Sequence, residues 1–404
     1  MPTGRPFSTP LLQAWTRATG LVGPDGSPTV PDGLSRAVRG LSDLFTRGRM
    51  ALPSPYLDEA GSRQAYLAYY FPVNLAKVRA LLDEMPEPVV EPEAGSRPFT
   101  VLDVGCGPGA AVLGTLDWFS QRIVAKPAPL HLVAVDRSPH ALEDCARVWA
   151  AYAEAARVRD ATLATVRADL ERFHPGNDPQ VGGRTYDLIV LANTLNELFT
   201  KAHDPLGRRV KLLQTLLALL GQHGTLMIIE PALRETSRGL HLLRNALLAE
   251  GACTVYSPCL HEQPCPALVK EGDWCHEERP WVAPPLVAAI DREVEFIKDA
   301  LKFSYLLLRK DGRSIVERSS DIYRVVSELR EMKGEKRAWL CHETGRPEVG
   351  RQDRLRSATN EAFDDWHRGA IVRIDQIVRK ERKGRESTIG RIPSEATVEI
   401  IRPI

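Results

Sequence analysis

The chain has 404 residues, of which 43% are hydrophobic and 26% charged, and its formal net charge is +1. This length exceeds that of a usual single domain, and the composition is that of a globular chain rather than of a disordered or fibrous one. No apolar run approaches the roughly 20 residues needed to span a bilayer, so we expect no membrane-spanning helix. Seven cysteines without an apolar export signal predict a reducing compartment, where thiols serve metals or chemistry rather than disulfides.

The first 95 residues predict a helical N-terminal region. Segments 34–48 and 62–85 both place apolar residues three and four positions apart, which is the period of an amphipathic helix. The stretch 84–98 is rich in Pro and Glu and predicts a linker.

From residue 96 to 312 the pattern changes to alternating strands and helices. The apolar strands are FTVLDVG (99–105), LHLVAVD (130–136), YDLIVLAN (186–193) and GTLMIIEP (224–231). Such continuous apolar strands between helices predict a parallel sheet covered on both faces, an α/β Rossmann-like domain. Residues 253–258 and 302–312 predict an antiparallel hairpin at its end, with a Cys-rich insert at 256–282 between the two strands.

Residues 313–404 predict a small basic β domain. Its candidate strands are 314–320, 323–329, 337–341, 370–378 and 396–404. The last 104 residues carry six more basic than acidic side chains, with a basic run at 379–386 and further arginines at 346, 351, 354 and 356. A solvated surface and a nucleic-acid-binding face explain this excess equally well.

A glycine-rich turn follows the first strand in LDVGCGPGA (102–110). Glycine at 105, 107 and 109 lets the backbone adopt positive φ and approach a ligand closely, a property that dinucleotide-binding folds share. Asp136 ends the next strand, where its carboxylate can accept two hydrogen bonds from a ribose diol, and Asp169 ends a third strand and can face an adenine ring. The candidate cofactor-binding residues are Asp103, Gly105, Gly107, Gly109, Asp136, Asp169 and Asn193.

This ordered set resembles the class I S-adenosylmethionine methyltransferases. A nicotinamide dehydrogenase is the second interpretation of the loop, and it fits less well because alanine-rich sequence replaces the third glycine of its motif. The alternative role of Asp136 is that of a helix N-cap, which the other residues of the set disfavour.

The segment ANTLNEL (192–198) follows the fourth strand, where the methyl acceptor is expected. It lacks the Asn/Asp-Pro-Pro-aromatic pattern that holds an exocyclic amine, and it contains no Pro-Cys nucleophile. Asn193, Asn196 and Glu197 either line the acceptor pocket or cap the following helix. The sequence therefore assigns no catalytic residue.

The insert contains Cys259, Cys265 and Cys275 in a segment rich in proline and charge. Three thiols in a short irregular segment suit zinc or an iron–sulfur cluster, and His261 or His276 can complete a Cys3His zinc site. The spacing matches neither a zinc ribbon nor a ferredoxin run, so spacing alone does not choose the metal. Three free thiols on a loop are the remaining alternative.

The other four cysteines differ in their surroundings. Cys341 ends a predicted strand with Gly and Pro just beyond it, which makes it the candidate for a fourth metal ligand. Cys106, Cys145 and Cys253 lie in apolar or glycine-rich surroundings and predict inert packing thiols.

The order of these parts resembles that of the methyltransferase-like assembly factors of the small ribosomal subunit, represented in animal mitochondria by methyltransferase-like protein seventeen. The segments that carry the resemblance are AYLAYYFPVNLAKVRALL (65–82), the insert 257–280, FSYLLLRKDG (303–312) and KGEKRAWLCHETGRP (333–347). The resemblance implies a [4Fe-4S] cluster held by Cys259, Cys265, Cys275 and Cys341, with zinc as the alternative.

The same resemblance implies binding to small-subunit rRNA during ribosome assembly. Two functions agree with it: an S-adenosylmethionine-dependent rRNA methyltransferase, or an assembly factor that keeps the fold without catalysis. A small-molecule methyltransferase with a zinc insert is the third alternative, and it predicts no association with ribosomal particles. We expect a monomer. Prolines near the N-terminus disfavour an amphipathic presequence, which predicts a bacterial cytoplasm, with the mitochondrial matrix as the alternative location.

Overall fold

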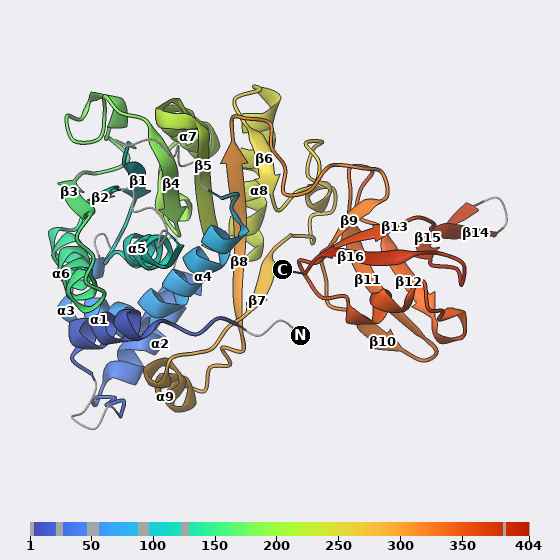
Figure 1. Cartoon of the computed structure of the whole chain (residues 1–404), viewed down its shortest axis with the longest axis horizontal. Coiled ribbons are helices and arrows are strands. Elements are labelled where there is room, and N and C mark those ends of the chain that lie inside the picture. The colour runs from blue at the N-terminus through green and yellow to red at the C-terminus, as the bar shows by residue number, and fades with distance from the viewer. Residues whose placement is uncertain are drawn as a thin grey trace.

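The structure is a computed structural model that describes residues 4–21, 27–46, 56–87, 97–122, 129–382 and 385–403. A helical region and a large mixed sheet form one side of the molecule, and a second, antiparallel-rich sheet forms the other (Figure 1). In the described part of the chain, no helix is both long and apolar enough to span a bilayer.

The large sheet has the strand order β3-β2-β1-β4-β5-β8-β6, and β7 pairs with β8. The first five strands are parallel, whereas β8 runs antiparallel to β5, β6 and β7. The predicted terminal hairpin therefore exists as β6 and β8. The strands span Phe99–Val104 (β1), Leu130–Asp136 (β2), Ala161–Arg167 (β3), Tyr186–Ala192 (β4), Leu220–Pro231 (β5), Thr254–Ser257 (β6), Glu277–Pro280 (β7) and Ala300–Arg309 (β8).

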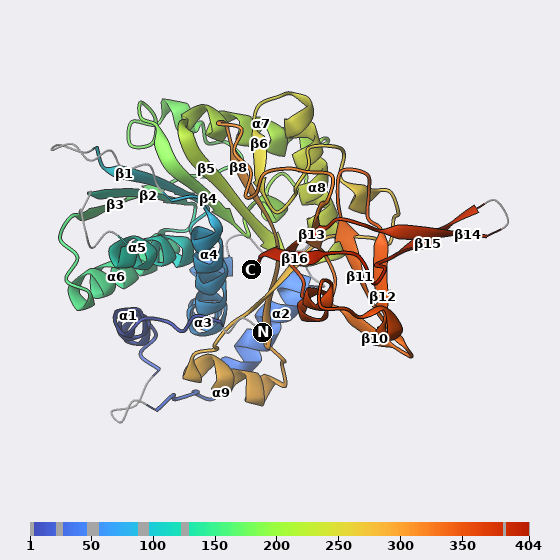
Figure 2. The same cartoon turned by 45° about the vertical axis from the view of Figure 1, so that its right-hand side comes forward.

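Helices cover both faces of this sheet because its strands are apolar on both sides. In β1, Val101 belongs to the core beneath one face and Leu102 to the core beneath the other. Helices α5 and α6 lie over the first core, and α7 and α8 lie over the second (Figure 2). The α/β Rossmann-like fold predicted from sequence is confirmed. The helices span Ala110–Arg122 (α5), Pro139–Ala155 (α6), Pro205–Leu219 (α7), Arg234–Ala249 (α8) and Pro285–Val294 (α9).

The N-terminal region is helical, as predicted, and adds to the first core. Trp15 donates its indole N–H to the carbonyl of Leu67 at 2.8 Å, which joins the first helix to the later ones. Most of the predicted linker, residues 88–96, lies outside the described residues. The elements are α1 (Thr9–Thr19), α2 (Leu34–Thr46), a 3-10 turn (Tyr56–Asp58), α3 (Ala60–Ala65), a π-helix (Tyr66–Tyr70) and α4 (Phe71–Glu84).

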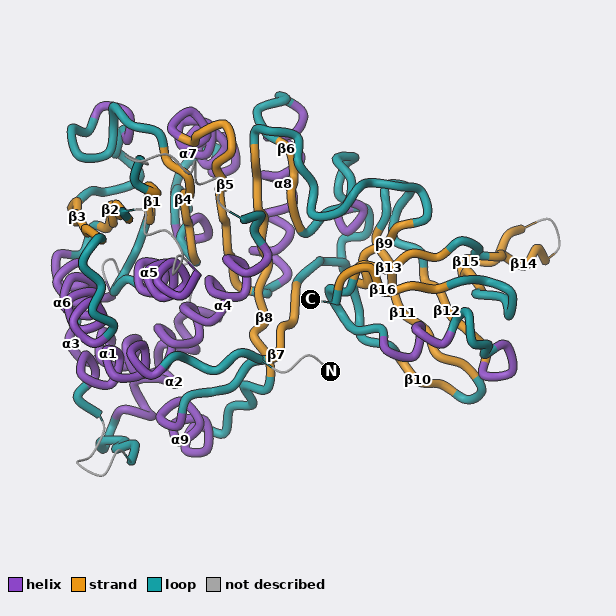
Figure 3. Tube along the Cα trace, viewed as in Figure 1, coloured by secondary structure: helices purple, strands orange, loops and turns teal. Residues whose placement is uncertain are grey.

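The second sheet has the order β14-β15-β12-β11-β9-β13-β16, with β10 paired to β11 (Figure 3). Val325, Leu340 and Val372 are fully buried in its core. The strand predicted at 314–320 is wrong: these residues form bends and loop, since polar side chains at Ser314, Glu317 and Arg318 offer no apolar face to pair. The strands span Ile322–Val325 (β9), Arg330–Met332 (β10), Glu335–Cys341 (β11), Glu348–Gln352 (β12), Ile371–Ile374 (β13), Val378–Arg382 (β14), Arg385–Arg391 (β15) and Val398–Arg402 (β16).

The basic run predicted at 379–386 falls on β14 and β15. The side chains of residues 380–386 lie outside the described part of the structure, so the basic run stays a prediction. Of the four nearby arginines, Arg351 is buried and paired with Asp364 at 2.7 Å, which removes it from any binding surface.

Candidate cofactor and cysteine sites

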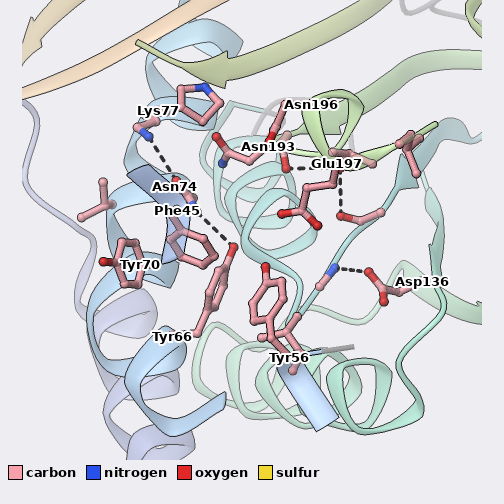
Figure 4. A pocket seen from close by; sticks show the side chains of 18 of the residues that line it. Phe45, Tyr56, Tyr66, Tyr70, Asn74, Lys77, Asp136, Asn193, Asn196 and Glu197 are labelled. Atoms are coloured by element: carbon pink, nitrogen blue, oxygen red, sulfur yellow. Dashed lines mark hydrogen bonds between the residues drawn. The ribbon is translucent and has the colours of Figure 1, made fainter. Parts of the chain in front are cut away.

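A cavity of about 370 Å³ opens at the carboxyl ends of the parallel strands (Figure 4). This is the edge of an open α/β sheet where ligands bind, at the point where the strand order reverses between β1 and β4. One wall comes from the loops that follow β1, β2, β3, β4 and β5, and the opposite wall comes from the N-terminal helical region.

The glycine loop after β1 forms the floor of the cavity. Gly105 has φ +76°, and a Cβ there would lie 2.4 Å from Cγ2 of Thr194, so both backbone conformation and space require glycine. The amide of Gly107 donates to Oδ2 of Asp136 at 2.8 Å, and the amide of Ser138 donates to Oδ1 at 2.9 Å. These bonds orient the carboxylate of Asp136, while burial raises its pKa.

Ser138, and not Asp136, is the N-cap of α6: its hydroxyl accepts a hydrogen bond from the amide of Ala141 at 3.2 Å. Asp136 also lines the cavity. The N-cap interpretation of Asp136 therefore does not hold, and its carboxylate borders the cavity.

Five of the seven predicted cofactor residues line the cavity: Gly105, Gly107, Asp136, Asp169 and Asn193. The other two lie behind it. Asp103 is 1% exposed, and burial together with neighbouring Asp136 raises its pKa to about 8. Gly109 faces α6, where a Cβ would lie 2.5 Å from the sulfur of Cys145.

The segment after β4 also faces the cavity, through Asn193, Asn196 and Glu197. The Nδ2 atom of Asn196 is buried without a hydrogen-bond partner, so an amide donor is available for a ligand. The next helix, α7, is capped by Asp204, whose Oδ1 accepts from the amide of Gly207 at 2.9 Å. Of the two interpretations of this segment, the structure favours cavity lining.

Sequence reasoning missed the wall that the N-terminal helices contribute. Figure 4 shows Phe45, Tyr56, Tyr66 and Tyr70 gathered on the side facing the glycine loop. A signal was present: Tyr66, Tyr70, Asn74 and Lys77 recur at helical spacing, and the last two are the polar residues of the otherwise apolar stretch 71–78. The π-helix at Tyr66–Tyr70 begins this wall, and such irregular turns frequently occur at functional sites.

Lys77 is the most unusual side chain of this wall. It is 9% exposed, and its ammonium donates to Oδ1 of Asn74 at 3.2 Å. The Nδ2 of Asn74 donates in turn to the hydroxyl of Tyr66 at 3.0 Å. Burial, and next the nearby Lys298, lower the pKa of Lys77 to about 7, and Glu230 only partly opposes this.

The Cys-rich insert packs against α8 and the edge of the large sheet. Arg238 donates from Nη1 to the carbonyls of Ala267, Lys270 and Asp273, at 3.1, 2.8 and 2.7 Å. The insert lacks its own apolar periodicity, so an arginine from a neighbouring helix satisfies its carbonyl groups.

The insert and β11 bring their cysteines to one place. Cys259, Cys275 and Cys341 line a cavity of about 30 Å³. Burial and the neighbouring thiols raise the pKa of Cys265 to about 12 and that of Cys341 well above its usual value. All seven cysteines are free thiols, and Cys106, Cys145 and Cys253 are buried, as predicted.

Among the described residues, no group of three or more His, Cys, Asp or Glu side chains is arranged to hold a metal ion. The metal site predicted from sequence is therefore not confirmed. The two histidines considered as metal ligands, His261 and His276, differ in their hydrogen-bond partners. The Nε2 of His261 lies 3.7 Å from the sulfur of Cys341, whereas His276 bonds to Glu278 at 3.0 Å. A Cys3His arrangement would thus favour His261.

A family model described as "Mitochondrial small ribosomal subunit Rsm22" matches residues 60–350, which is more than half of the chain. The chain belongs to the Rsm22 family. The matched range includes the part of the N-terminal cavity wall from Tyr66 to Lys77, the large sheet, the insert and Cys341. The mitochondrial description of the Rsm22 family fits the alternative location given above.

A search of curated proteins finds no match for this Rsm22-family chain. Solved methyltransferase structures are similar to it. A putative class I S-adenosylmethionine-dependent methyltransferase from Listeria monocytogenes has 10% identity and TM-score 0.36, covering 76% of this chain and 88% of that one. A putative methyltransferase from Thermoplasma acidophilum has 16% identity and TM-score 0.29, covering 54% and 71%.

The CcbJ methyltransferase from Streptomyces caelestis has 16% identity and TM-score 0.23, covering 39% of this chain. The chain spans 48% of the length of CcbJ. At these identities and TM-scores the similarities carry no argument about individual residues.

Proposed function

We propose that this chain is an S-adenosylmethionine-binding, methyltransferase-like factor that acts in assembly of the small ribosomal subunit by binding rRNA, and that it transfers a methyl group to that RNA. The observation that carries the proposal is the cavity in which the glycine loop, Asp136 and Asp169 meet at the reversal point of the sheet. Membership of the Rsm22 family supports the ribosomal part.

The residues of the cavity fit S-adenosylmethionine, which supplies a methyl group on a sulfonium. Gly105 and Gly107 leave room for close approach of the ligand, and Asp136 presents carboxylate oxygens for the ribose hydroxyls. Asp169 borders the adenine side, and Asn193 borders the side where the methyl acceptor enters. Catalysis by this chain is then mainly a matter of positioning, because methyl transfer needs the nucleophile in line with the sulfonium carbon.

We further propose that the chain holds a [4Fe-4S] cluster through Cys259, Cys265, Cys275 and Cys341. The support is the chemistry of the donor set: four free thiols from two distant segments, three of which line one small cavity. Arg244 is fully buried and lies within electrostatic reach of several of these sulfurs, where its charge would offset that of thiolate ligands.

The cluster would join the insert to the second sheet, because Cys341 ends β11 while the other three thiols come from the insert. Ligand binding of this kind contributes to folding free energy, so the cluster would stabilise docking of the C-terminal sheet. Zinc is the alternative occupant, and iron and sulfide analysis of anaerobically purified protein separates the two.

The experiment that tests the function is methyl transfer from labelled S-adenosylmethionine to assembling small-subunit particles. We expect label in rRNA with the unmodified chain and a large loss with Asp136→Ala. Binding to the particles without transfer would support the alternative of a non-catalytic assembly factor. Absence of both transfer and co-sedimentation would contradict a ribosomal role and favour a small-molecule methyltransferase with a zinc insert.

A further inference from the structure

The cavity carries opposite charges at its two sides. Among the described residues that line it, the loops after the parallel strands contribute four acidic side chains and one arginine, and the charged side chains of the opposite side are lysines. The acidic residues are Asp136, Asp169, Glu171 and Glu197, the arginine is Arg137, and the lysines are Lys77, Lys298 and Lys302. Figure 4 shows Asp136 and Lys77 on opposite sides of the space, with Asn193 near Lys77. An elongated ligand with a diol at one end and an anion at the other would match this distribution.

Of the three lysines that line the cavity, Lys77 differs in its partners. Lys302 is 54% exposed and pairs with Glu278 at 3.3 Å. Lys298 lies over the ring of Tyr69 at 5.7 Å and is stabilised by Asp291. Lys77 has no ion pair among the described residues, and Asn74 is the acceptor of its hydrogen bond.

The surroundings of Lys77 hold its amine in place. Asn74 is 7% exposed and is itself fixed by its bond to the hydroxyl of Tyr66. Because Tyr66 accepts a hydrogen bond from Asn74, its own O–H proton remains free to donate. Burying the ammonium of Lys77 is costly and Glu230 offsets this cost only in part, so an anion that enters the cavity would stabilise the protonated form of Lys77.

S-adenosylmethionine has one carboxylate, in its amino-acid part, at the end away from the adenine. With the ribose at Asp136, the amino-acid part is left to reach the opposite wall. We propose that Lys77 binds the carboxylate of the amino-acid part of S-adenosylmethionine, with Asn74 and Tyr66 as the residues that position it. This inference rests on the proposed cofactor site and assigns a role in it to the N-terminal helical region.

Two ligands that differ in the amino-acid part test the assignment by calorimetric titration. S-adenosylhomocysteine contains the carboxylate, whereas 5′-methylthioadenosine contains the same adenosine group without it. We expect Lys77→Met to weaken binding of S-adenosylhomocysteine at least tenfold and to change binding of 5′-methylthioadenosine less than twofold. The matched control is Lys336→Met, which removes a lysine of the second sheet that is paired with Glu331 and Asp364 and does not line the cavity, and it is expected to change both affinities less than twofold.

The possible results are distinguishable. Equal weakening of both ligands by Lys77→Met, or no weakening of S-adenosylhomocysteine, would overturn the role of Lys77 and leave the cofactor site standing. No binding of either ligand to the unmodified chain would overturn the cofactor site itself. Retained binding of 5′-methylthioadenosine in the variant also shows that its fold is intact.

Discussion

Oε2 of Glu84, in the last residue of α4, accepts a hydrogen bond from Nη2 of Arg279 in β7 at 2.6 Å. Both side chains are buried, and the hydroxyl of Tyr305 donates to the other oxygen of Glu84 at 2.6 Å. Arg324 of β9 pairs with Glu277 at 2.7 Å and donates to Tyr305 at 2.9 Å. One buried network therefore joins the N-terminal helices, the large sheet and the second sheet.

Replacing Glu84 with Gln should lower the free energy of unfolding by about 3 kcal/mol, because the buried side chains of Arg279 and Arg324 would then share Glu277 as their counter-charge. Equilibrium denaturation in urea at pH 7 measures this. The matched control is Glu87→Gln, three residues further along the chain. It removes an exposed ion pair with Arg122 and should lower the free energy of unfolding by less than about 1 kcal/mol. Equal losses in the two variants would contradict the importance of the network.

The same network predicts loss of stability in acid. Burial alone would raise the pKa of Glu84, but Arg279, Arg324 and hydrogen bonds from Ser257 and Tyr305 outweigh it and lower the pKa to about 2. Since the folded-state pKa lies below the unfolded value of about 4.5, the unfolded chain takes up the proton first as the pH falls.

Glu84 thus stabilises the fold fully above pH 4.5, and this contribution disappears as the pH falls towards 2. The difference in unfolding free energy between the unmodified chain and Glu84→Gln should shrink from about 3 kcal/mol at pH 7 to less than about 1 kcal/mol near pH 2.5. A difference that stays constant over this range would show that Glu84 is not the group responsible.

Two glycines offer a test of the cofactor loop. Gly105→Ala should cost at least about 2 kcal/mol of stability and abolish S-adenosylhomocysteine binding, because φ is +76° and the added methyl would collide with Thr194. Gly239→Ala, at an open position in α8, should stabilise the protein by about 0.5 to 1 kcal/mol. Thermal unfolding and calorimetric titration check both. Normal ligand binding by the Gly105 variant would argue against close approach at this loop.

The proposed cluster predicts a local effect of losing one ligand. Cys275→Ser should lower the iron content of anaerobically purified protein and speed proteolysis of residues 313–404, while S-adenosylhomocysteine affinity stays unchanged. Cys253→Ala, which alters a buried thiol outside the group, should keep the iron. Unchanged protection of the C-terminal sheet in the Cys275 variant would show that no cluster secures it.

The sequence predicted the large sheet well because strands such as β1 and β2 are apolar on both faces and end in glycine or acid. The residues from Phe99 to Gly105 show both features. The sequence was less informative for the second sheet. Its strands β12 and β15 contain charged residues and a glycine, Gly350 or Gly390, which obscure the alternation of apolar and polar side chains expected of a strand.

The sequence predicted the side of the cavity formed by the loops after the strands, and it did not predict the wall formed by the N-terminal helices. Gly105 and Asp136 lie at fixed offsets from strands, so a short motif reveals them. Lys77 lies on a helix whose role depends on tertiary packing, and its sequence signal was the helical spacing that it shares with Tyr66, Tyr70 and Asn74. Cys341 was a candidate fourth ligand from its place at a strand end as well as from the resemblance, but no local pattern in the chain specifies that it meets the insert.

The proposed function depends most on the cofactor cavity, and one titration tests directly whether this cavity binds the cofactor. S-adenosylhomocysteine added to the full chain should bind once per chain, and Asp136→Ala should weaken that binding at least tenfold, because the carboxylate that faces the ribose is lost. No binding to the unmodified chain, or equal affinity in the Asp136 variant, would contradict the proposed site.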